Sequence, residues 1–166
     1  MQKRRKIVVK VGTKVITSKD RALDKERLKD LVRQISDIKD KGVDVLLVTS
    51  GAIGAGLWLL GAKKRPTALS ELQATAAIGQ NHLMHLYSEY FKERGYLTGQ
   101  VLLTQEDFND RARYLNIKHT MDALLAHNIV PVINENDTVA TEEIKCGDND
   151  RLSGLVADLC QAEKLI

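Results

Sequence analysis

Apolar residues follow two spacings along the chain, and these spacings predict strands that alternate with helices. Short β-branched runs predict four buried strands, at residues 7–12, 45–49, 100–104 and 129–133. Helical spacing of apolar residues predicts four longer helices, at residues 24–41, 67–94, 114–127 and 148–161. Three smaller elements complete the pattern: a short helix after Gly51 that ends at Leu60, a hairpin over residues 138–146, and a fifth strand over residues 164–166.

Strands that alternate with helices over this length predict an α/β fold, a three-layer α/β/α sandwich around a largely parallel sheet. Ligands of such sheets bind at the carboxyl ends of the strands. Polar or glycine-rich clusters directly follow three of the predicted strands, at residues 12–13, 50–56 and 134–137. These clusters are therefore the candidate functional residues.

Composition limits the kind of protein this is. The 166 residues are 43% hydrophobic, which suits one domain or a large part of one. No run approaches the ~20 apolar residues of a membrane helix, and Lys10 interrupts the apolar stretch that a secretory signal would need. Cys146 and Cys160 are too few for a disulfide framework. We expect a soluble, cytoplasmic protein with no membrane partner.

Charge and histidine content argue against two further classes of site. The net charge of +3 is too balanced for a dedicated nucleic-acid binder. The basic run at residues 3–6 is either a polyanion patch or, as we favour because few aromatics accompany it, a solvated lead-in to the first strand. His82 and His85 share a helix face, but no third zinc ligand is near them in sequence, so we expect no metal site.

The glycine-rich segment at residues 50–56, called the glycine loop below, fits neither the P-loop nor the dinucleotide fingerprint. It still joins a strand to a helix start, where backbone N–H groups can face an anion. The alternative is a tight turn packed against the sheet. The residues alone do not separate these two readings.

Lys10 stands in an otherwise apolar strand, where a charge is costly unless it is paired or meets a ligand. Gly12 and Thr13 follow it at the predicted carboxyl end. We therefore favour a lysine that faces a phosphate over one that reaches outward into solvent from an edge strand.

The third cluster is the densest in polar side chains. Residues 134–137 read Asn-Glu-Asn-Asp, and residues 147–150 read Gly-Asp-Asn-Asp at a helix start. Such carboxylates and amides can hold the ammonium of a zwitterion, a divalent cation or one another. Turn and helix-cap chemistry uses the same residue types, so Asp148 is also a candidate N-cap.

Together these motifs resemble the amino acid kinase family. The resemblance rests on residues 9–13, 48–53, 100–104, 130–137 and 147–150, in this order and spacing. It runs from about Ile7 to the last residue, and the segment 134–150 is similar to the members that phosphorylate L-glutamate. It implies ATP-dependent phosphorylation of the glutamate side-chain carboxylate to L-glutamyl 5-phosphate, the first step of proline biosynthesis, with Mg²⁺ arriving on ATP.

The resemblance also implies roles for individual residues. Lys10 would bind the transferring phosphoryl group, and Asp150 would orient the catalytic lysines. Gly12, Thr13, Gly51 and Ala52 would line the phosphate region. The substrate glutamate would be held by Ser50, Asn134, Asp137 and Asn149, with Asp137 facing its α-ammonium. A homo-oligomer and feedback inhibition by proline are further expectations.

One departure from the family pattern concerns the end of the chain. Family members continue with a strand that ends in Thr-Asp and a nucleotide-binding half with a second lysine, which have no counterpart in residues 1–166. We therefore expect residues 1–166 to be the glutamate-binding part of a kinase domain, incomplete at its C-terminus and inactive alone. The alternatives are a relative with another carboxylate substrate, such as aspartate, acetylglutamate or carbamate, and a non-catalytic amino-acid-binding or oligomerisation module.

Overall fold

The computed structural model describes residues 4–18, 22–140 and 148–166, and they form one parallel sheet with helices on both faces. The described strands lie in the order β3-β4-β2-β1-β5, and all their pairings are parallel. Their bounds are β1 (Lys6–Val11), β2 (Asp44–Thr49), β3 (Thr98–Leu103), β4 (Val130–Glu135) and β5 (Lys164–Leu165). The predicted three-layer α/β/α class is confirmed.

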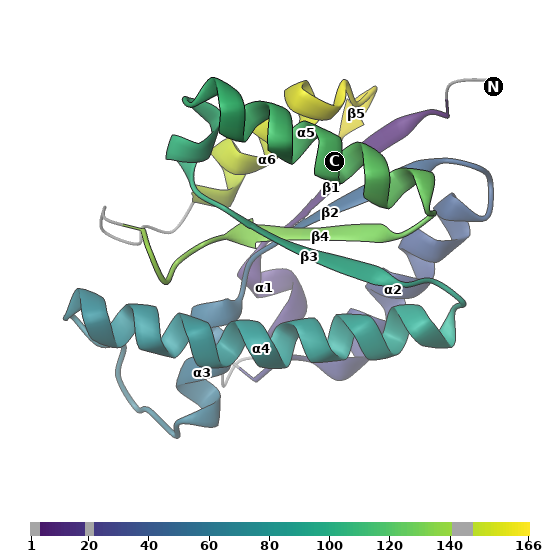
Figure 1. Cartoon of the computed structure of the whole chain (residues 1–166). Coiled ribbons are helices and arrows are strands. Elements are labelled where there is room, and N and C mark those ends of the chain that lie inside the picture. Colours follow the sequence, from purple (N-terminus) through teal and green to yellow (C-terminus); the bar gives the residue numbers. More distant parts are fainter. Residues whose placement is uncertain (1–3, 19–21, 141–147) are drawn as a thin grey trace.

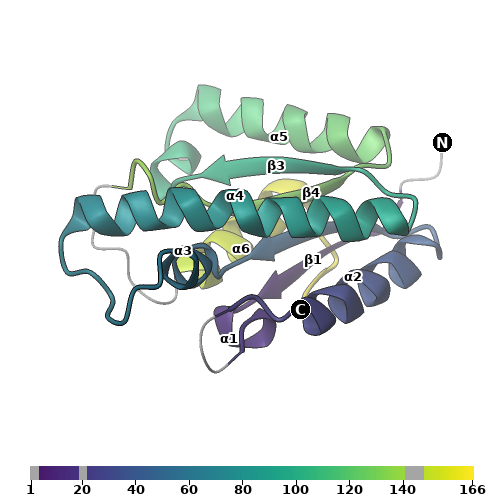
Figure 2. The ribbon, with the colours of Figure 1, turned by 90° about the horizontal axis from the view of Figure 1, so that it is seen from below.

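The helices form the two outer layers of the sandwich (Figure 1 and Figure 2). One layer holds α1 (Thr13–Ile16), α2 (Lys25–Lys39), α3 (Ala52–Leu59) and α4 (Leu69–Glu93). The other holds α5 (Arg111–Ala126) and α6 (Asp148–Cys160). Across the described ranges, none of these helices combines the length and the apolar character needed to cross a bilayer.

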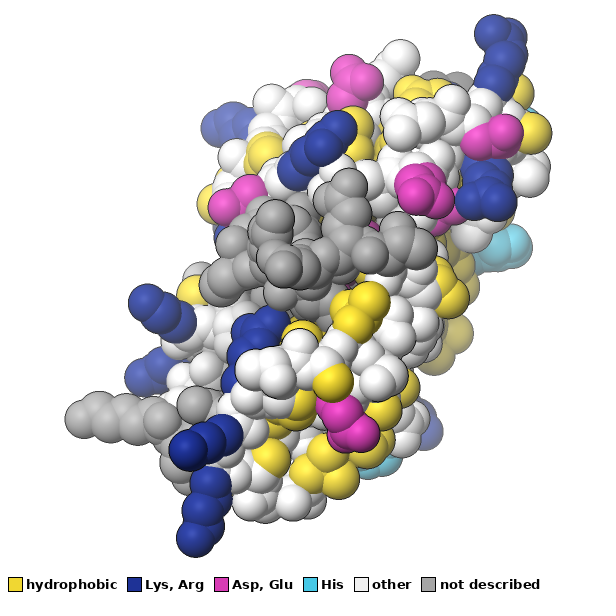
Figure 3. All heavy atoms as spheres, turned by 90° about the vertical axis from the view of Figure 1, so that its left-hand side faces the viewer, with side chains coloured by type: hydrophobic (Ala, Val, Ile, Leu, Met, Phe, Trp, Pro, Cys, Tyr) yellow, Lys and Arg dark blue, Asp and Glu magenta, His cyan; other side chains and the backbone are white. Residues whose placement is uncertain are grey.

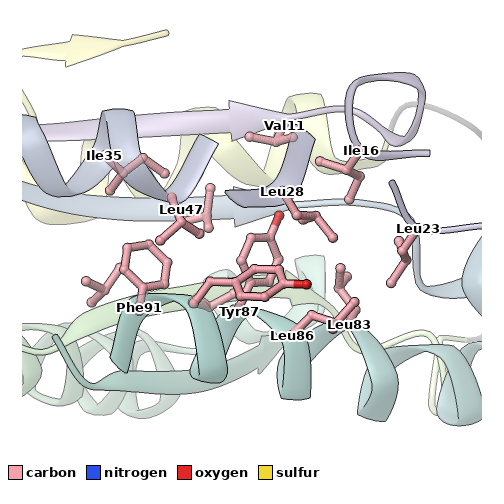
Figure 4. Close-up of a cluster of buried hydrophobic side chains, with 14 of the residues drawn as sticks. Val11, Ile16, Leu23, Leu28, Ile35, Leu47, Leu83, Leu86, Tyr87 and Phe91 are labelled. Atoms are coloured by element: carbon pink, nitrogen blue, oxygen red, sulfur yellow. The ribbon is translucent and has the colours of Figure 1, made fainter. Parts of the chain in front are cut away.

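Alternate residues of the inner strands β1, β2 and β4 enter opposite cores, as expected for a sheet covered on both faces. In β2, Val45 and Leu47 join the core under α2 and α4, whereas Leu46 and Val48 join the core under α5 and α6. Figure 4 shows the first core, where Tyr87 and Phe91 of α4 point toward the strands. Burial on both sides explains why β2 is apolar from Val45 to Val48.

Most predicted elements are present with ends shifted by a few residues. Two short elements were missed: α1 directly after β1, and a 3₁₀ turn, η1 (Gln105–Phe108). The turn starts with a capping box in which the Asp107 carboxylate accepts from the Thr104 backbone N–H at 2.7 Å. The hairpin predicted over residues 138–146 falls largely on residues 141–147, which lie outside the described residues.

Pro131 occupies a central strand, although proline has no N–H for a sheet hydrogen bond. The Val130 N–H donates toward the β3 side, to the Leu97 carbonyl at 2.9 Å. Because successive N–H groups alternate in direction, the Pro131 nitrogen faces β2, and the β2 pairing begins only at Val132. The missing donor therefore costs no ladder bond.

Helices α3 and α4 cross at two glycines that permit very close backbone contact. A Cβ on Gly79 of α4 would lie 1.7 Å from the Ala52 carbonyl oxygen, at the start of α3. A Cβ on Gly56 of α3 would lie 2.0 Å from the Thr75 carbonyl oxygen. No side chain fits either position. Gly79 therefore serves close packing, and α4 continues through it without a break.

Gly79→Ala should destabilise the protein, since the added methyl group forces the two helices apart. Overpacking of this kind typically costs about 1–3 kcal/mol. The matched control is Gly154→Ala in α6, where a Cβ meets nothing within 4 Å and where alanine favours the helix by up to about 1 kcal/mol. Thermal unfolding of the complete gene product that contains these residues should show a lower Tm for the first variant only. Equal Tm values would contradict the close crossing.

Candidate active site

The predicted site residues come together at the carboxyl edge of the sheet, where β1, β2 and β4 end beside the starts of α3 and α6. Figure 3 views the molecule from the left-hand side of Figure 1, toward which these strands run. Basic and acidic side chains are interspersed over that face. Hydrophobic side chains gather in its lower half, over α3 and the start of α4, where Trp58, Leu59, Leu60 and Leu69 are exposed.

Lys10 lies near the end of β1, with its side chain 29% exposed, and its ammonium forms an ion pair with the Asp150 carboxylate of α6. A Cβ on Gly12 would lie 3.7 Å from the Lys10 Nζ, so the ammonium lies beside the turn that follows β1. Asp150 is mostly exposed. The lysine is therefore paired, yet it remains at a surface that a second anion can reach.

The glycine loop turns β2 into α3 through a left-handed residue. Gly51 has φ of 106° and precedes Ala52, the first residue of α3. A Cβ there would also lie 3.1 Å from Cδ1 of Ile16, in the short helix α1. The first N–H groups of a helix have no intrahelical acceptor. The N-cap residue of α3 is Gly51, which has no side chain that could accept from them. The Ala52 end of α3 therefore offers backbone donors beside β1 and β2.

A network of side-chain amides, called the asparagine network below, joins α6, β2, β4 and α4. Its centre is Asn149, whose Nδ2 donates to the Thr49 carbonyl at 2.9 Å, to Ser50 Oγ at 2.7 Å and to Asn134 Oδ1 at 3.0 Å. Asn134 Nδ2 in turn donates to Gln80 Oε1 at 2.8 Å. The ends of two neighbouring strands are thus tied to two helices by side chains.

Beneath the glycine loop, Thr49 Oγ1 and the Tyr87 hydroxyl share a hydrogen bond of 2.9 Å in the core. Tyr87 is fully buried, and burial raises the pKa of its hydroxyl above the usual value. Thr49 Oγ1 also lies 3.2 Å from the Ser50 carbonyl, to which it can donate. The pair anchors the end of β2 to the C-terminal half of α4.

Thr13 and Asp137 follow β1 and β4 at the same edge, whereas His82 belongs to α4. Thr13 begins α1 directly after Gly12, and its methyl carbon would lie 3.7 Å from a Cβ on Gly54 of α3. Asp137 is half-buried two residues after the end of β4. His82 stacks on Trp58 with ring centroids 6.4 Å apart, and burial lowers its pKa. Within residues 4–18, 22–140 and 148–166, no three side chains of His, Cys, Asp or Glu form a metal-binding group.

Three contributors to the site were missed from the sequence: Gln80, Tyr87 and Ile16. Gln80 carried a usable signal, because it is a polar residue in the buried stripe of α4 between Ala76 and Leu83. Tyr87 lies in the same stripe, where an aromatic residue is expected from packing alone. Ile16 belongs to a four-residue helix that no periodicity reveals.

The sheet order, the lysine at the end of β1 and the glycine loop define a class of protein, and comparison with known families agrees. Residues 5–166 match the amino acid kinase family. The chain belongs to this family.

Glutamate 5-kinases are among the curated relatives of the chain. The chain is 53% identical over 161 residues to a protein named glutamate 5-kinase from Caldanaerobacter subterraneus subsp. tengcongensis, and this match covers 97% of the chain and 43% of the relative. A glutamate 5-kinase from Nitrosomonas eutropha is 49% identical over 166 residues, which are 44% of its length. The chain therefore spans less than half the length of these relatives.

Among solved structures, carbamate kinase from Giardia lamblia bound to AMP-PNP has the same fold. It superimposes with a TM-score of 0.64 at 14% sequence identity, over 99% of this chain and 70% of that protein. A second structure of the Giardia carbamate kinase also gives a TM-score of 0.64. At this identity the likeness concerns the fold.

Thr49→Val should cost more stability than Tyr87→Phe, although each removes one hydroxyl group. Valine leaves the buried Tyr87 hydroxyl without its partner, which costs about 1–3 kcal/mol. Phenylalanine leaves Thr49 Oγ1 its contact with the Ser50 carbonyl, so the loss is only about 0.5–1.5 kcal/mol. Urea unfolding of both variants of the complete gene product measures the difference, and the reverse order would contradict this role of the hydroxyl pair.

Proposed function

We propose that this chain is the glutamate-binding part of an enzyme that uses ATP to phosphorylate the side-chain carboxylate of L-glutamate, which gives L-glutamyl 5-phosphate for proline biosynthesis. One observation carries the proposal: a lysine ammonium, a glycine-rich helix start and an amide network lie together at one sheet edge. This combination offers a cationic place for phosphate beside a polar place for an amino acid. Identities near 50% to glutamate 5-kinases support the same choice of substrate.

The chemistry of this reaction needs no general base. A glutamate side chain has a reference pKa of ~4.3, so the attacking carboxylate is already ionised at neutral pH. The difficulty is that two anions, the carboxylate and the terminal phosphate of ATP, must meet in line. Positioning and positive charge therefore supply the catalysis.

On the phosphate side, Lys10 would neutralise charge on the transferring phosphoryl group. The backbone N–H groups at Gly51 and Ala52 would donate to its oxygens, with Gly12 and Thr13 lining the same region. The absence of a side chain at Gly12 supports this arrangement, because it leaves the Lys10 ammonium uncovered on that side. Asp150 would hold the lysine in place through the ion pair already present.

On the glutamate side, Ser50, Asn134 and Asn149 would hold the substrate, and Asp137 would face its α-ammonium. Ser50 Oγ accepts from Asn149, so its own hydroxyl hydrogen is available to a substrate carboxylate. A buried carboxamide network suits a zwitterion, because it offers donors and acceptors without adding net charge.

Magnesium would arrive with ATP and be held chiefly by phosphate oxygens, as is usual for this ion. The described residues fit that arrangement, since Asp150 is the acidic side chain paired beside Lys10 and no dedicated acidic cage accompanies it. We extend the proposal, on the family resemblance alone, to a cytoplasmic homo-oligomer that proline inhibits.

The direct test is a kinase assay on the complete gene product that contains these residues. L-Glutamate, L-aspartate, N-acetyl-L-glutamate and carbamate are each supplied with MgATP, and acyl phosphate is trapped as the hydroxamate where the product allows. We expect turnover with L-glutamate at least about a hundredfold above the other substrates, since a site that pairs every polar group of its substrate rejects analogues strongly. Preference for another carboxylate would reassign the substrate. Calorimetric glutamate binding without turnover would instead support a non-catalytic module.

Lys10→Met should lower kcat with little change in the KM for glutamate, because the ammonium acts on charge that is greatest in the transition state. Loss of such a group commonly costs roughly 10²–10³-fold in rate. Lys14→Met is the matched control, since Lys14 is exposed in the adjacent helix α1. Steady-state kinetics of both variants give the kcat and the KM for glutamate that test this expectation. A Lys10 variant as fast as the control would show that this lysine does not act on the transferring phosphoryl group.

Asp137→Ala should raise the KM for glutamate far more than the KM for ATP, because the α-ammonium loses its anionic partner. A charge-assisted hydrogen bond is worth about 1.5–3 kcal/mol, which corresponds to roughly 10- to 160-fold. Asp158→Ala in the exposed part of α6 serves as the control. Equal rises in both KM values would indicate damage to the fold around β4 instead of loss of a substrate contact.

A further inference from the structure

We propose that Gln80 is a positioning residue for substrate binding: it fixes the orientation of the asparagine network and thereby the acceptor that the network presents to glutamate. The inference rests on the proposed function for the identity of the substrate. Gln80 belongs to α4 and is only 8% exposed, and its Oε1 accepts from Asn134 Nδ2 at 2.8 Å. It reaches the site through Asn134.

Two backbone groups that cannot reverse identify which atom of each amide is nitrogen and which is oxygen. The Thr49 carbonyl accepts only, so the atom of Asn149 at 2.9 Å from it is the NH₂ nitrogen. The Glu135 N–H donates only, so the atom of Asn134 at 2.9 Å from it is the oxygen. This assignment turns the NH₂ group of Asn134 toward Gln80.

Gln80 therefore has to supply an acceptor, and it does so from a buried position. Asn134 is only 2% exposed, so without Gln80 its Nδ2 would be a buried donor with no acceptor in place. Such a group reorients or admits water because an unpaired buried donor is costly. Either change pulls Asn134 Oδ1 away from Asn149.

The orientation of the network determines which atom of Asn149 is available to the substrate. Its NH₂ group is shared among three acceptors, whereas its Oδ1 is buried with no hydrogen-bond partner within the described part of the chain. That oxygen is an unused acceptor at the site, and the α-ammonium of an amino acid is a donor that would satisfy it. Gln80 thus holds the network in the one orientation that leaves an oxygen for a cationic group.

The close crossing of α3 and α4 explains how a residue of α4 reaches β4. Gly79, the neighbour of Gln80, lies against the Ala52 carbonyl at a separation that admits no Cβ. The same crossing therefore positions the start of α3 and the side chain of Gln80. The contact between Gly79 and the Ala52 carbonyl therefore holds both the candidate phosphate site and the residue that orients the substrate-binding amides.

The test compares four variants of the complete gene product. Gln80→Met removes the acceptor at similar volume, and Gln80→Asn keeps an amide but is one methylene too short. Gln80→Glu restores an oxygen acceptor in either protonation state. Asn81→Met, at the exposed neighbouring position of α4, is the matched control. The readouts are the KM values for glutamate and for ATP, the Tm, and the side-chain NH₂ signals of Asn134 and Asn149 in ¹⁵N NMR spectra.

We expect Gln80→Met and Gln80→Asn to raise the KM for glutamate about tenfold, with the KM for ATP within about twofold of wild type. Gln80→Glu and Asn81→Met should stay within about threefold of wild type. The NMR signals of both asparagine amides should shift in the first two variants only, whether or not the protein turns over glutamate. This readout separates the inference from the proposed function, which fails if wild type shows no activity.

Three results would overturn the positioning role. Parallel rises in both KM values, accompanied by a lower Tm, would show that Gln80 acts only on stability. Gln80→Glu behaving like Gln80→Met would show that the acceptor is irrelevant. Unchanged asparagine signals in Gln80→Asn, a polar variant that should fold even if Gln80→Met does not, would remove the proposed coupling.

Discussion

The contact between Gly79 and the Ala52 carbonyl sets the geometry on which the candidate site depends. No other residue type fits at position 79, because a Cβ would lie 1.7 Å from that oxygen. The contact places α4 directly against the start of α3, where the glycine loop leaves the end of β2. It also brings Gln80 within reach of Asn134, and Tyr87, two turns further on, within reach of Thr49.

At this edge the charged groups lie nearer the surface than the side-chain amide of Asn134. Lys10 is paired with an exposed carboxylate at the start of α6, so the pair remains accessible to solvent and to an incoming anion. The asparagine network lies deeper and is held by uncharged hydrogen bonds. A site for phosphoryl transfer between two anions needs this division, because the positive charge must meet the phosphate while neutral polar groups orient the amino acid.

The sequence predicted the layers of the fold because its strands are apolar on both faces and its helices carry periodic apolar positions. It also predicted the residues at the carboxyl edge, since parallel strands end at one side of a sheet. It did not reveal that Asn149 bonds to Thr49, because that contact spans 100 positions and depends on how α6 packs. The supporting role of α1 was hidden as well, because four residues are too few for a periodic signal.

Resemblance to a family added the identity of the chemistry, which hydrophobic patterning alone cannot supply. Lys10 illustrates the difference: its position in an apolar strand indicated a ligand or a partner, and the structure supplies the partner, Asp150. The contact of Lys10 with the phosphate of ATP belongs to the proposed function. For Asp137, the resemblance likewise supplied the ammonium ligand, and the structure supplies its place two residues after β4.

The most direct test of the account is a crystal structure of the complete gene product with L-glutamate and a non-hydrolysable ATP analogue. We expect the terminal phosphate within hydrogen-bond distance of Lys10 Nζ and the Ala52 N–H. We also expect the glutamate α-ammonium within hydrogen-bond distance of Asp137 and of Asn149 Oδ1, with the side-chain carboxylate directed at the phosphate. Glutamate bound away from the carboxyl ends of β2 and β4, or a phosphate remote from Lys10, would contradict the account.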